Sequence, residues 1–200
     1  MTCFHYAPRP GVAPPLARRP GRPRRGDHAA YAVRMALTED DLAHLRRCVE
    51  LAREALDAGD EPFGSVLVHD GRRVAEDRNR ETSLADETRH PEFDLARRAA
   101  ELLTAEERSA ATLYTSGEHC PMCAAANGWV GIGRIVYAVS TEQFVGWLRE
   151  WGVGPAPVAP LPVNAVAPGI IVEGPAPELA DEVRELHRRL RESRSPGALG

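Results

Sequence analysis

The chain has 200 residues, of which 43% are hydrophobic and 27% are charged, and these values are ordinary for a soluble globular protein. No apolar run approaches the roughly 18 residues that a membrane-spanning helix needs, so we expect no transmembrane segment. Residues 1–34 hold seven arginines and one acid, which leaves 18 arginines and 28 acids in residues 35–200. This acidic balance argues against binding along a nucleic acid and favours a small-molecule substrate.

Residues 1–36 are rich in Pro, Arg, Gly and Ala and lack hydrophobic periodicity, so they are predicted to form a disordered tail. An arginine-rich arm that touches nucleic acid is the alternative for this segment. We expect one folded domain over residues 37–195. The four cysteines lack the spacing of a disulfide framework, and no secretory signal is recognisable. This combination predicts a cytoplasmic protein.

The first predicted element of the domain is a helix over residues 38–57. Thr38, followed three residues later by Asp41, resembles a capping box at its start. Apolar residues repeat along one face and are predicted to point into the core: Leu42, Leu45, Val49, Ala52 and Leu56. Cys48 lies next to this face and is predicted to be a small buried residue.

Strands and helices alternate along the rest of the chain. In chain order the predicted elements are strand 63–70, strand 73–79, helix 90–103, strand 111–116, helix 121–133, strand 134–140, helix 141–152, strand 169–173 and helix 177–192. The Pro-rich stretch 155–168 is predicted to be a long surface loop, and His187 in the last helix a surface residue. The alternation predicts an α/β fold with helices on both faces of a sheet that is largely parallel after its first hairpin.

Two of the predicted helices begin with residues that bind metals. H-P-E (residues 90–92) opens one and C-P-M-C (residues 120–123) opens the next, each with a proline at the first helical position. A structural zinc site needs four protein ligands, whereas His90, Cys120 and Cys123 supply three and leave one position for water, as in catalytic sites. Helix N-termini also stabilise thiolates. Glu92 can reach such a water without binding the metal.

Three simpler interpretations of these residues stay open. The C-x-x-C pair could be a redox dithiol, although redox motifs of this kind lack a partner H-x-E. His119 could be the fourth ligand of a structural zinc site. Glu92 could serve only as a helix-start carboxylate that interacts with the helix dipole.

The order and spacing of the two motifs resemble those of the zinc-dependent cytidine/deoxycytidylate deaminase-like superfamily, in which H-x-E is followed by P-C-x-x-C. Here 26 residues separate Glu92 from His119, which holds the position of the family's Pro. The segment PFGSVLV is similar to a strand of the family, and Asn79 stands where family members hold the substrate ring. The segment YTSGEHCPMC is similar to the form found in nucleobase (guanine or cytosine) deaminases and tRNA adenosine deaminases.

This resemblance, which covers residues 38–150, implies a three-layer α-β-α sandwich around a mixed five-stranded sheet. It implies Zn²⁺ bound by His90, Cys120 and Cys123, with Glu92 as the catalytic residue that carries protons. The residues expected to contact the substrate are Asn79, Ser65, Glu118, His119 and Trp129. The resemblance also implies a homodimer.

The expected reaction is the hydrolytic release of ammonia from a small amino-heterocycle or nucleobase. Guanine deaminases carry a Gly-Phe-Asp-Asp segment after the fourth strand, whereas this chain has WLREWGVGP in that region. Guanine is therefore no more favoured than cytosine, an aminopyrimidine-like base or an aminotriazine. The alternatives are an adenosine or cytidine deaminase that acts on tRNA or another nucleic acid, and a non-catalytic zinc-binding protein.

Overall fold

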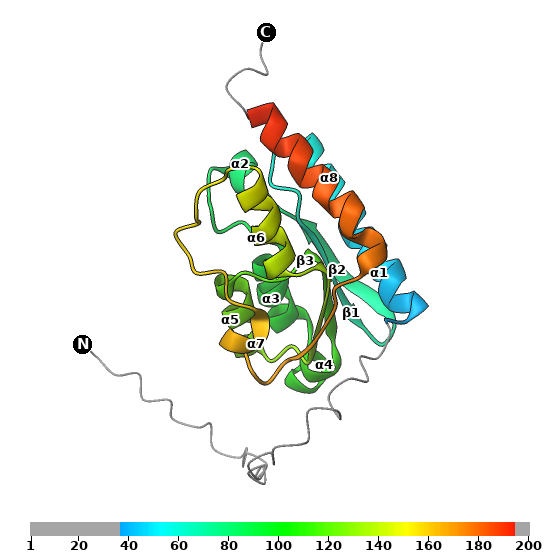
Figure 1. Cartoon of the computed structure of the whole chain (residues 1–200). Helices are drawn as coiled ribbons and strands as arrows, with labels where there is room; N and C mark the ends of the chain where they lie inside the picture. Colours follow the sequence, from blue (N-terminus) through cyan, green and yellow to red (C-terminus); the bar gives the residue numbers. More distant parts are fainter. Residues whose placement is uncertain (1–36, 195–200) are drawn as a thin grey trace, which may run out of the picture. The chain divides into compact units, whose positions relative to one another are not determined.

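Five strands form one mixed sheet in the computed structural model, which describes residues 37–194 (Figure 1). The strands are β1 (Gly64–His69), β2 (Arg72–Arg78), β3 (Thr112–Gly117), β4 (Arg134–Val139) and β5 (Ile171–Glu173). They lie in the order β2-β1-β3-β4-β5. Strand β1 is antiparallel to both β2 and β3, whereas β3, β4 and β5 are parallel to one another. The predicted α/β fold with a mixed five-stranded sheet is therefore confirmed.

Eight helices lie before, between and after these strands in the described residues. They are α1 (Glu39–Asp57), α2 (Glu81–Leu84), α3 (Pro91–Leu102), α4 (Ala105–Ala110), α5 (Pro121–Val130), α6 (Thr141–Glu150), α7 (Val163–Val166) and α8 (Pro177–Arg194). The five helices predicted from sequence are all present. Helix α5 ends earlier than predicted because Gly131 adopts the left-handed conformation, with φ of 81°. Helices α2, α4 and α7 were not predicted, since segments this short show no full hydrophobic period.

The predicted tail, residues 1–36, lies outside the described residues, and the domain limits 37–195 stay a prediction. The described residues fall within one compact unit. None of their helices is both long enough and apolar enough to cross a membrane.

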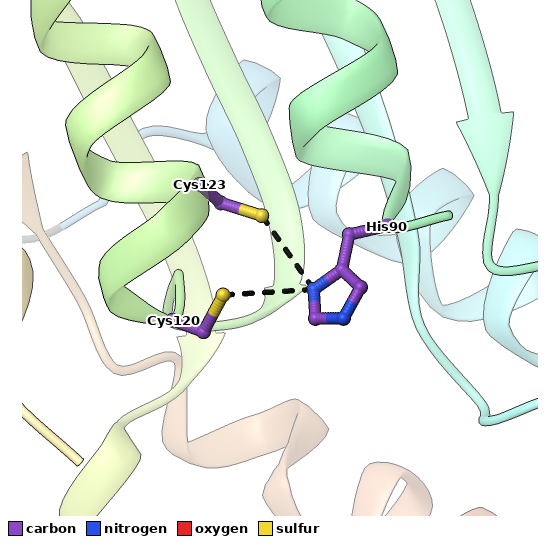
Figure 2. A group of neighbouring side chains, drawn as sticks. All are labelled: His90, Cys120 and Cys123. Carbon is purple, nitrogen blue, oxygen red and sulfur yellow. Dashed lines mark hydrogen bonds between the residues drawn. The ribbon is translucent and has the colours of Figure 1, made fainter. Parts of the chain in front are cut away.

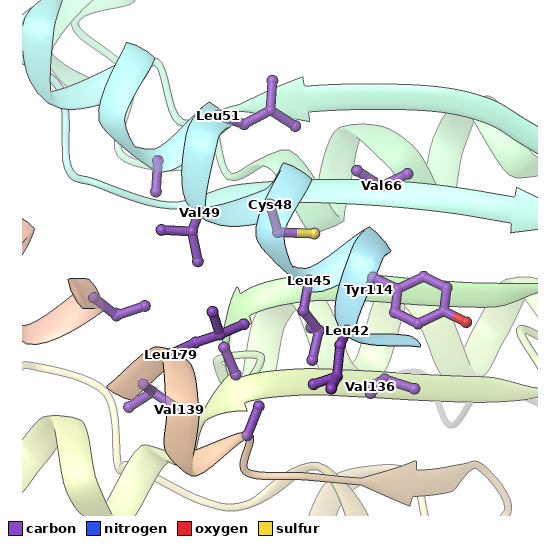
Figure 3. Packing of buried hydrophobic residues seen from close by; sticks show 14 of the residues in the cluster. Leu42, Leu45, Cys48, Val49, Leu51, Val66, Tyr114, Val136, Val139 and Leu179 are labelled. Atoms are coloured by element: carbon purple, nitrogen blue, oxygen red, sulfur yellow. The ribbon is translucent and has the colours of Figure 1, made fainter. Parts of the chain in front are cut away.

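Helices cover both faces of the sheet, and alternate residues of a strand point to opposite faces. Val66 and Val68 of β1 pack in one apolar cluster with α1 and α8, whereas Leu67 between them packs in a second cluster with α3 and α5. Figure 3 shows the first cluster, in which side chains of α1 lie over the strands. Cys48 is fully buried there, as predicted. Helix α1 approaches β1 so closely that a Cβ on Gly64 would lie 2.4 Å from the Cys48 carbonyl oxygen.

The capping box predicted at the start of α1 is confirmed. The Asp41 N–H donates to the Thr38 hydroxyl, and the Thr38 N–H donates to the Asp41 carboxylate. Asp41 also accepts hydrogen bonds from the Tyr114 hydroxyl at 2.8 Å and from Arg134 at 2.7 Å. One buried carboxylate thus ties the start of α1 to β3 and β4.

The prediction that His187 lies on the surface is wrong. Its side chain is fully buried on α8, with its ring centroid 4.8 Å from that of Phe63 and 4.7 Å from that of Phe144. Neither ring nitrogen has a hydrogen-bond partner. Burial lowers the pKa of His187 to about 3, so the imidazole is neutral at physiological pH.

Candidate active site

His90, Cys120 and Cys123 come together where two neighbouring helices begin (Figure 2). His90 is the N-cap of α3 and Cys120 the N-cap of α5, and a proline follows each of them at the first helical position. Helices α3 and α5 pack against each other on the same face of the sheet. Their N-termini therefore bring His90 Nδ1 to 3.6 Å from Cys120 Sγ and 3.5 Å from Cys123 Sγ.

These distances fit three ligands of one tetrahedral zinc ion. With Zn–N bonds of about 2.0–2.1 Å and Zn–S bonds of about 2.3 Å, tetrahedral N and S ligands lie about 3.5 Å apart. All three ligand atoms lie within 4.8 Å of one another, and no fourth His, Cys, Asp or Glu among residues 37–194 belongs to the group. His119 is thus no part of the ligand group, and one position on the ion would stay open.

The three ligands form a strongly polarised cluster. Hydrogen bonds from Cys123 and His90 lower the pKa of Cys120 to about 4, although burial opposes the shift. The contact with Cys120, together with burial, raises the pKa of Cys123. Burial lowers the pKa of His90, but hydrogen bonds to Cys120 and Glu81 prevail and raise it to about 11. Because zinc binds thiolates and neutral imidazole, its binding must release the protons that His90 and Cys123 hold.

Glu92 lies beside the ligand group without belonging to it. It occupies the first turn of α3 and is 4% exposed. Its Oε1 accepts a hydrogen bond from the Thr115 hydroxyl at 2.8 Å, and the Ser65 hydroxyl lies 3.2 Å from the same oxygen. Its Oε2 lies 3.6 Å from Cys123 Sγ. Strand hydroxyls thus hold one carboxylate oxygen while the other faces the metal ligands.

Thr115 and Asn127 are site residues that sequence reasoning missed. Thr115 pairs with Ser65 across β3 and β1, so both hydroxyls reach Glu92. A polar residue within a buried strand was the available signal for Thr115, because a buried hydroxyl needs a partner. Asn127 lies one turn beyond Cys123 and donates to the backbone carbonyls of Glu92 at 3.2 Å and Cys123 at 3.0 Å. This amide ties α3 to α5 at the site, and no motif marked it.

Asn79 is fully buried just after β2 and contacts a third residue that the sequence did not mark, Glu81. Its Oδ1 accepts the N–H of Glu81 at 2.9 Å, and its Nδ2 donates to Glu81 Oε1 at 2.6 Å. The same carboxylate oxygen of Glu81 lies 3.0 Å from Nε2 of His90. Asn79 is therefore linked to a metal ligand through one side chain.

Glu118 and His119 follow β3 and differ in their surroundings. The Glu118 carboxylate accepts the N–H groups of Thr141 at 2.8 Å and Val163 at 3.0 Å, so it holds the starts of α6 and α7. It also lines a surface cleft beside α6 that contains none of the metal ligands. His119 is 1% exposed, and both its ring nitrogens are buried without a hydrogen-bond partner. Burial lowers the pKa of His119 and keeps it neutral.

Trp129 is not brought to the ligand group. Its side chain is 82% exposed, so it is no core residue. It lies nine residues after Cys120 along α5, which places it about 13 Å farther along the helix axis. Trp129 therefore lies away from the ligand group within this chain, and its predicted contact with the substrate stays a prediction.

Comparisons with known proteins agree with this geometry. A model of the MafB19-like deaminase family matches residues 39–163. A protein of Schizosaccharomyces pombe named as a probable cytosine deaminase is 34% identical over 131 residues, which are 64% of this chain and 76% of that protein. A tRNA-specific adenosine deaminase of Agrobacterium fabrum is 43% identical over 102 residues, which are 51% of this chain and 66% of the relative.

Solved structures share the fold. The structure of a guanine deaminase from Nitrosomonas europaea matches with a TM-score of 0.57 and 24% sequence identity, and it covers 76% of this chain and 84% of that one. The predicted three-layer fold is thereby confirmed. The group of His90, Cys120 and Cys123 is typical of the zinc site in deaminases of this fold, so the predicted zinc cofactor is confirmed as well.

Proposed function

Because this chain belongs to the MafB19-like deaminase family, within the cytidine/deoxycytidylate deaminase-like superfamily, we propose that it removes the amino group of a small heterocycle or free nucleobase by hydrolysis. The observation that carries the proposal is the placement of Glu92. One of its oxygens accepts a hydrogen bond from Thr115, and the other lies 3.6 Å from Cys123 Sγ. A carboxylate held in this way can transfer protons without binding the metal.

The residues then have distinct roles in the proposed reaction. Zinc held by His90, Cys120 and Cys123 would supply the Lewis acidity that makes water nucleophilic near neutral pH. Glu92 would take one proton from the attacking water as its oxygen bonds to the amino-bearing carbon, and would pass that proton to the adjacent ring nitrogen. It would then carry the second proton of the water to the amino group. The C–N bond breaks, ammonia leaves, and the ring keeps a carbonyl.

Asn79 is proposed to orient the ring. Its two bonds to Glu81 leave the amide with one N–H and one oxygen lone pair, which suits a heterocycle that has both a donor and an acceptor on its edge. Ser65 was expected to contact the substrate, but its hydrogen bond reaches Glu92, so we assign it to holding that carboxylate. Glu118 is likewise assigned to holding α6 and α7.

His119 is the second proposed substrate contact. A neutral imidazole offers one donor and one acceptor, and burial of both without partners is unfavourable. A polar substituent of the substrate that pairs with either nitrogen would recover part of this free energy. His119 would then favour substrates that carry such a substituent over substrates that lack it. A Pro at this position, as in the family, would make no such distinction.

A deaminase that acts on a base within tRNA or another nucleic acid is the alternative, and the name of the Agrobacterium fabrum relative is its support. This alternative predicts binding that weakens steeply with salt. The 28 acids against 18 arginines in residues 35–200 oppose it. We therefore favour a small heterocyclic amine as the partner. The cytoplasmic location and the homodimer stay predictions.

An ammonia-release screen tests the proposal. The zinc-loaded protein would be incubated with cytosine, guanine, adenine, aminotriazines and the corresponding nucleosides. We expect release from at least one free heterocycle, at a rate that does not depend on tRNA. No release from any of these compounds, together with inosine formation in tRNA, would favour the alternative. Zinc binding without either activity would indicate a non-catalytic protein.

A further inference from the structure

One carboxylate joins a metal ligand to the residue proposed to orient the substrate. Glu81 opens α2, and its Oε1 lies 3.0 Å from Nε2 of His90 and 2.6 Å from Nδ2 of Asn79. The Glu81 backbone N–H donates to Asn79 Oδ1 at 2.9 Å. Its side chain is 23% exposed, and that of His90 24%, so both are largely shielded from water.

These contacts fix the tautomer of His90. Nδ1 faces the two cysteine sulfurs at 3.6 and 3.5 Å, so this nitrogen must present its lone pair when the metal binds, and the hydrogen must sit on Nε2. An ionised carboxylate can only accept hydrogen bonds. Glu81 therefore favours the tautomer that ligates metal and disfavours the one with a lone pair on Nε2.

The same residue fixes the amide of Asn79. The Glu81 N–H can only donate, so Asn79 Oδ1 must face it, and the Glu81 carboxylate can only accept, so Nδ2 must face that group. The remaining N–H and lone pair of Asn79 then have determined directions. A flipped amide would place a donor against a donor and an acceptor against an acceptor.

We propose that Glu81 is a positioning residue that orients His90 for zinc and Asn79 for the substrate at the same time. The effect on His90 concerns metal binding alone, whereas the effect on Asn79 rests on the proposed function. Glu81 touches neither the metal nor the reacting atoms in this role. Its removal should weaken zinc binding first and substrate binding in addition.

The test measures the dissociation constant of zinc by competition with a chromophoric chelator, in the full-length protein without substrate. Three variants are compared with the wild type: E81A, E81Q and the control E87Q. Glu87 is an exposed residue of the same segment, and it makes no hydrogen bond or ion pair within the described part of the chain. The glutamine of E81Q keeps the size of Glu81 but can donate as well as accept, so it no longer selects one imidazole tautomer.

We expect E81A to weaken zinc binding by about 10- to 100-fold, E81Q to weaken it by a smaller factor, and E87Q to leave it unchanged. If E81A does not fold, the zinc affinity of E81Q alone tests the proposal. Zinc affinity equal to that of the wild type in E81Q and in any folded E81A would overturn the proposal for His90. For Asn79, zinc-saturated E81Q should show a raised KM, and an unchanged KM would overturn that part. Weakened zinc binding in a protein that deaminates nothing would leave the role at His90 standing and refute the proposed function.

Discussion

Thr115 donates its hydroxyl hydrogen to Oε1 of Glu92 over 2.8 Å, at a point where both side chains are buried. The carboxylate is carried by the first turn of α3 and is held by a residue of β3. The sheet therefore sets the direction of a side chain that a helix supplies. Because Oε1 is occupied in this way, Oε2 is the oxygen left beside the metal ligands for the proposed proton transfer.

Replacement of Thr115 by valine should slow turnover without loss of zinc. Valine has nearly the same shape but cannot donate to Glu92, and a hydrogen bond to a charged group contributes about 1.5–3 kcal/mol. We expect kcat to fall by about 10- to 100-fold in T115V. T115S restores the hydroxyl and should recover most of the rate. Steady-state kinetics on the substrate found by the screen, with zinc measured in each preparation, check this; wild-type rates in T115V would contradict it.

Replacement of His119 by phenylalanine should separate stability from substrate binding. The free protein loses two buried nitrogens that have no partner, so its melting temperature should stay the same or rise. The KM should rise by about 10-fold if the substrate pairs with the imidazole. H119P, which carries the residue common in the family, should show the same loss for this substrate. A fall in melting temperature with an unchanged KM would mean that His119 serves the core alone.

Replacement of Gly64 by alanine should destabilise the protein. The added Cβ would lie 2.4 Å from the Cys48 carbonyl oxygen and 2.4 Å from Leu51 Cβ, so α1 or β1 must shift. Overpacking of this kind costs about 1–3 kcal/mol. Gly146 is the matched control, because a Cβ there meets nothing within 4 Å, and G146A on α6 should be neutral or stabilising. Urea unfolding of zinc-loaded proteins measures both, and equal stability of G64A and the wild type would contradict the prediction.

Burial of His187 should lower the free energy of unfolding of the protein in mild acid. Its pKa is lowered to about 3 in the folded protein by burial, whereas in the unfolded chain it is about 6.5. Below pH 6.5 the unfolded state thus binds more protons than the folded state. The contribution of neutral His187 to the free energy of unfolding is therefore complete above pH 6.5 and is lost as pH falls toward 3. The slope is about 1.4 kcal/mol per pH unit. H187F should show a shallower loss than the wild type between pH 6 and pH 4 in urea unfolding, and parallel curves would contradict this origin.

The metal ligands could be predicted because each lies at a helix start that the sequence marks. Proline after His90 and after Cys120 indicates the first helical position, and the shared fold brings the two helix starts together. Thr115 and Glu81 could not be assigned in the same way. Each contacts a residue far along the chain or across a loop, and neither that contact of Thr115 nor that of Glu81 is marked by the spacing of the motifs.

The positions of His187 and Trp129 have physical explanations in the helices. His187 lies four residues after the buried Val183 and three before the buried Leu190, so the helical period predicts a side chain that points inward. The many Arg and Glu residues around it in the sequence instead suggested a surface position. Trp129 lies on α5 more than two turns after Cys120, so the same helix that positions Cys120 carries the indole away from it. Burial of an aromatic residue cannot be read from its type alone.

Ammonia release by the zinc-loaded E92Q variant tests the central claim most directly. The glutamine keeps the shape of Glu92 and can still accept from Thr115, but it cannot take up a proton. We predict that E92Q retains zinc and folds normally while its kcat falls by at least about 100-fold on the substrate found by the screen. Full zinc occupancy with wild-type ammonia release would contradict the assignment of Glu92 as the proton carrier.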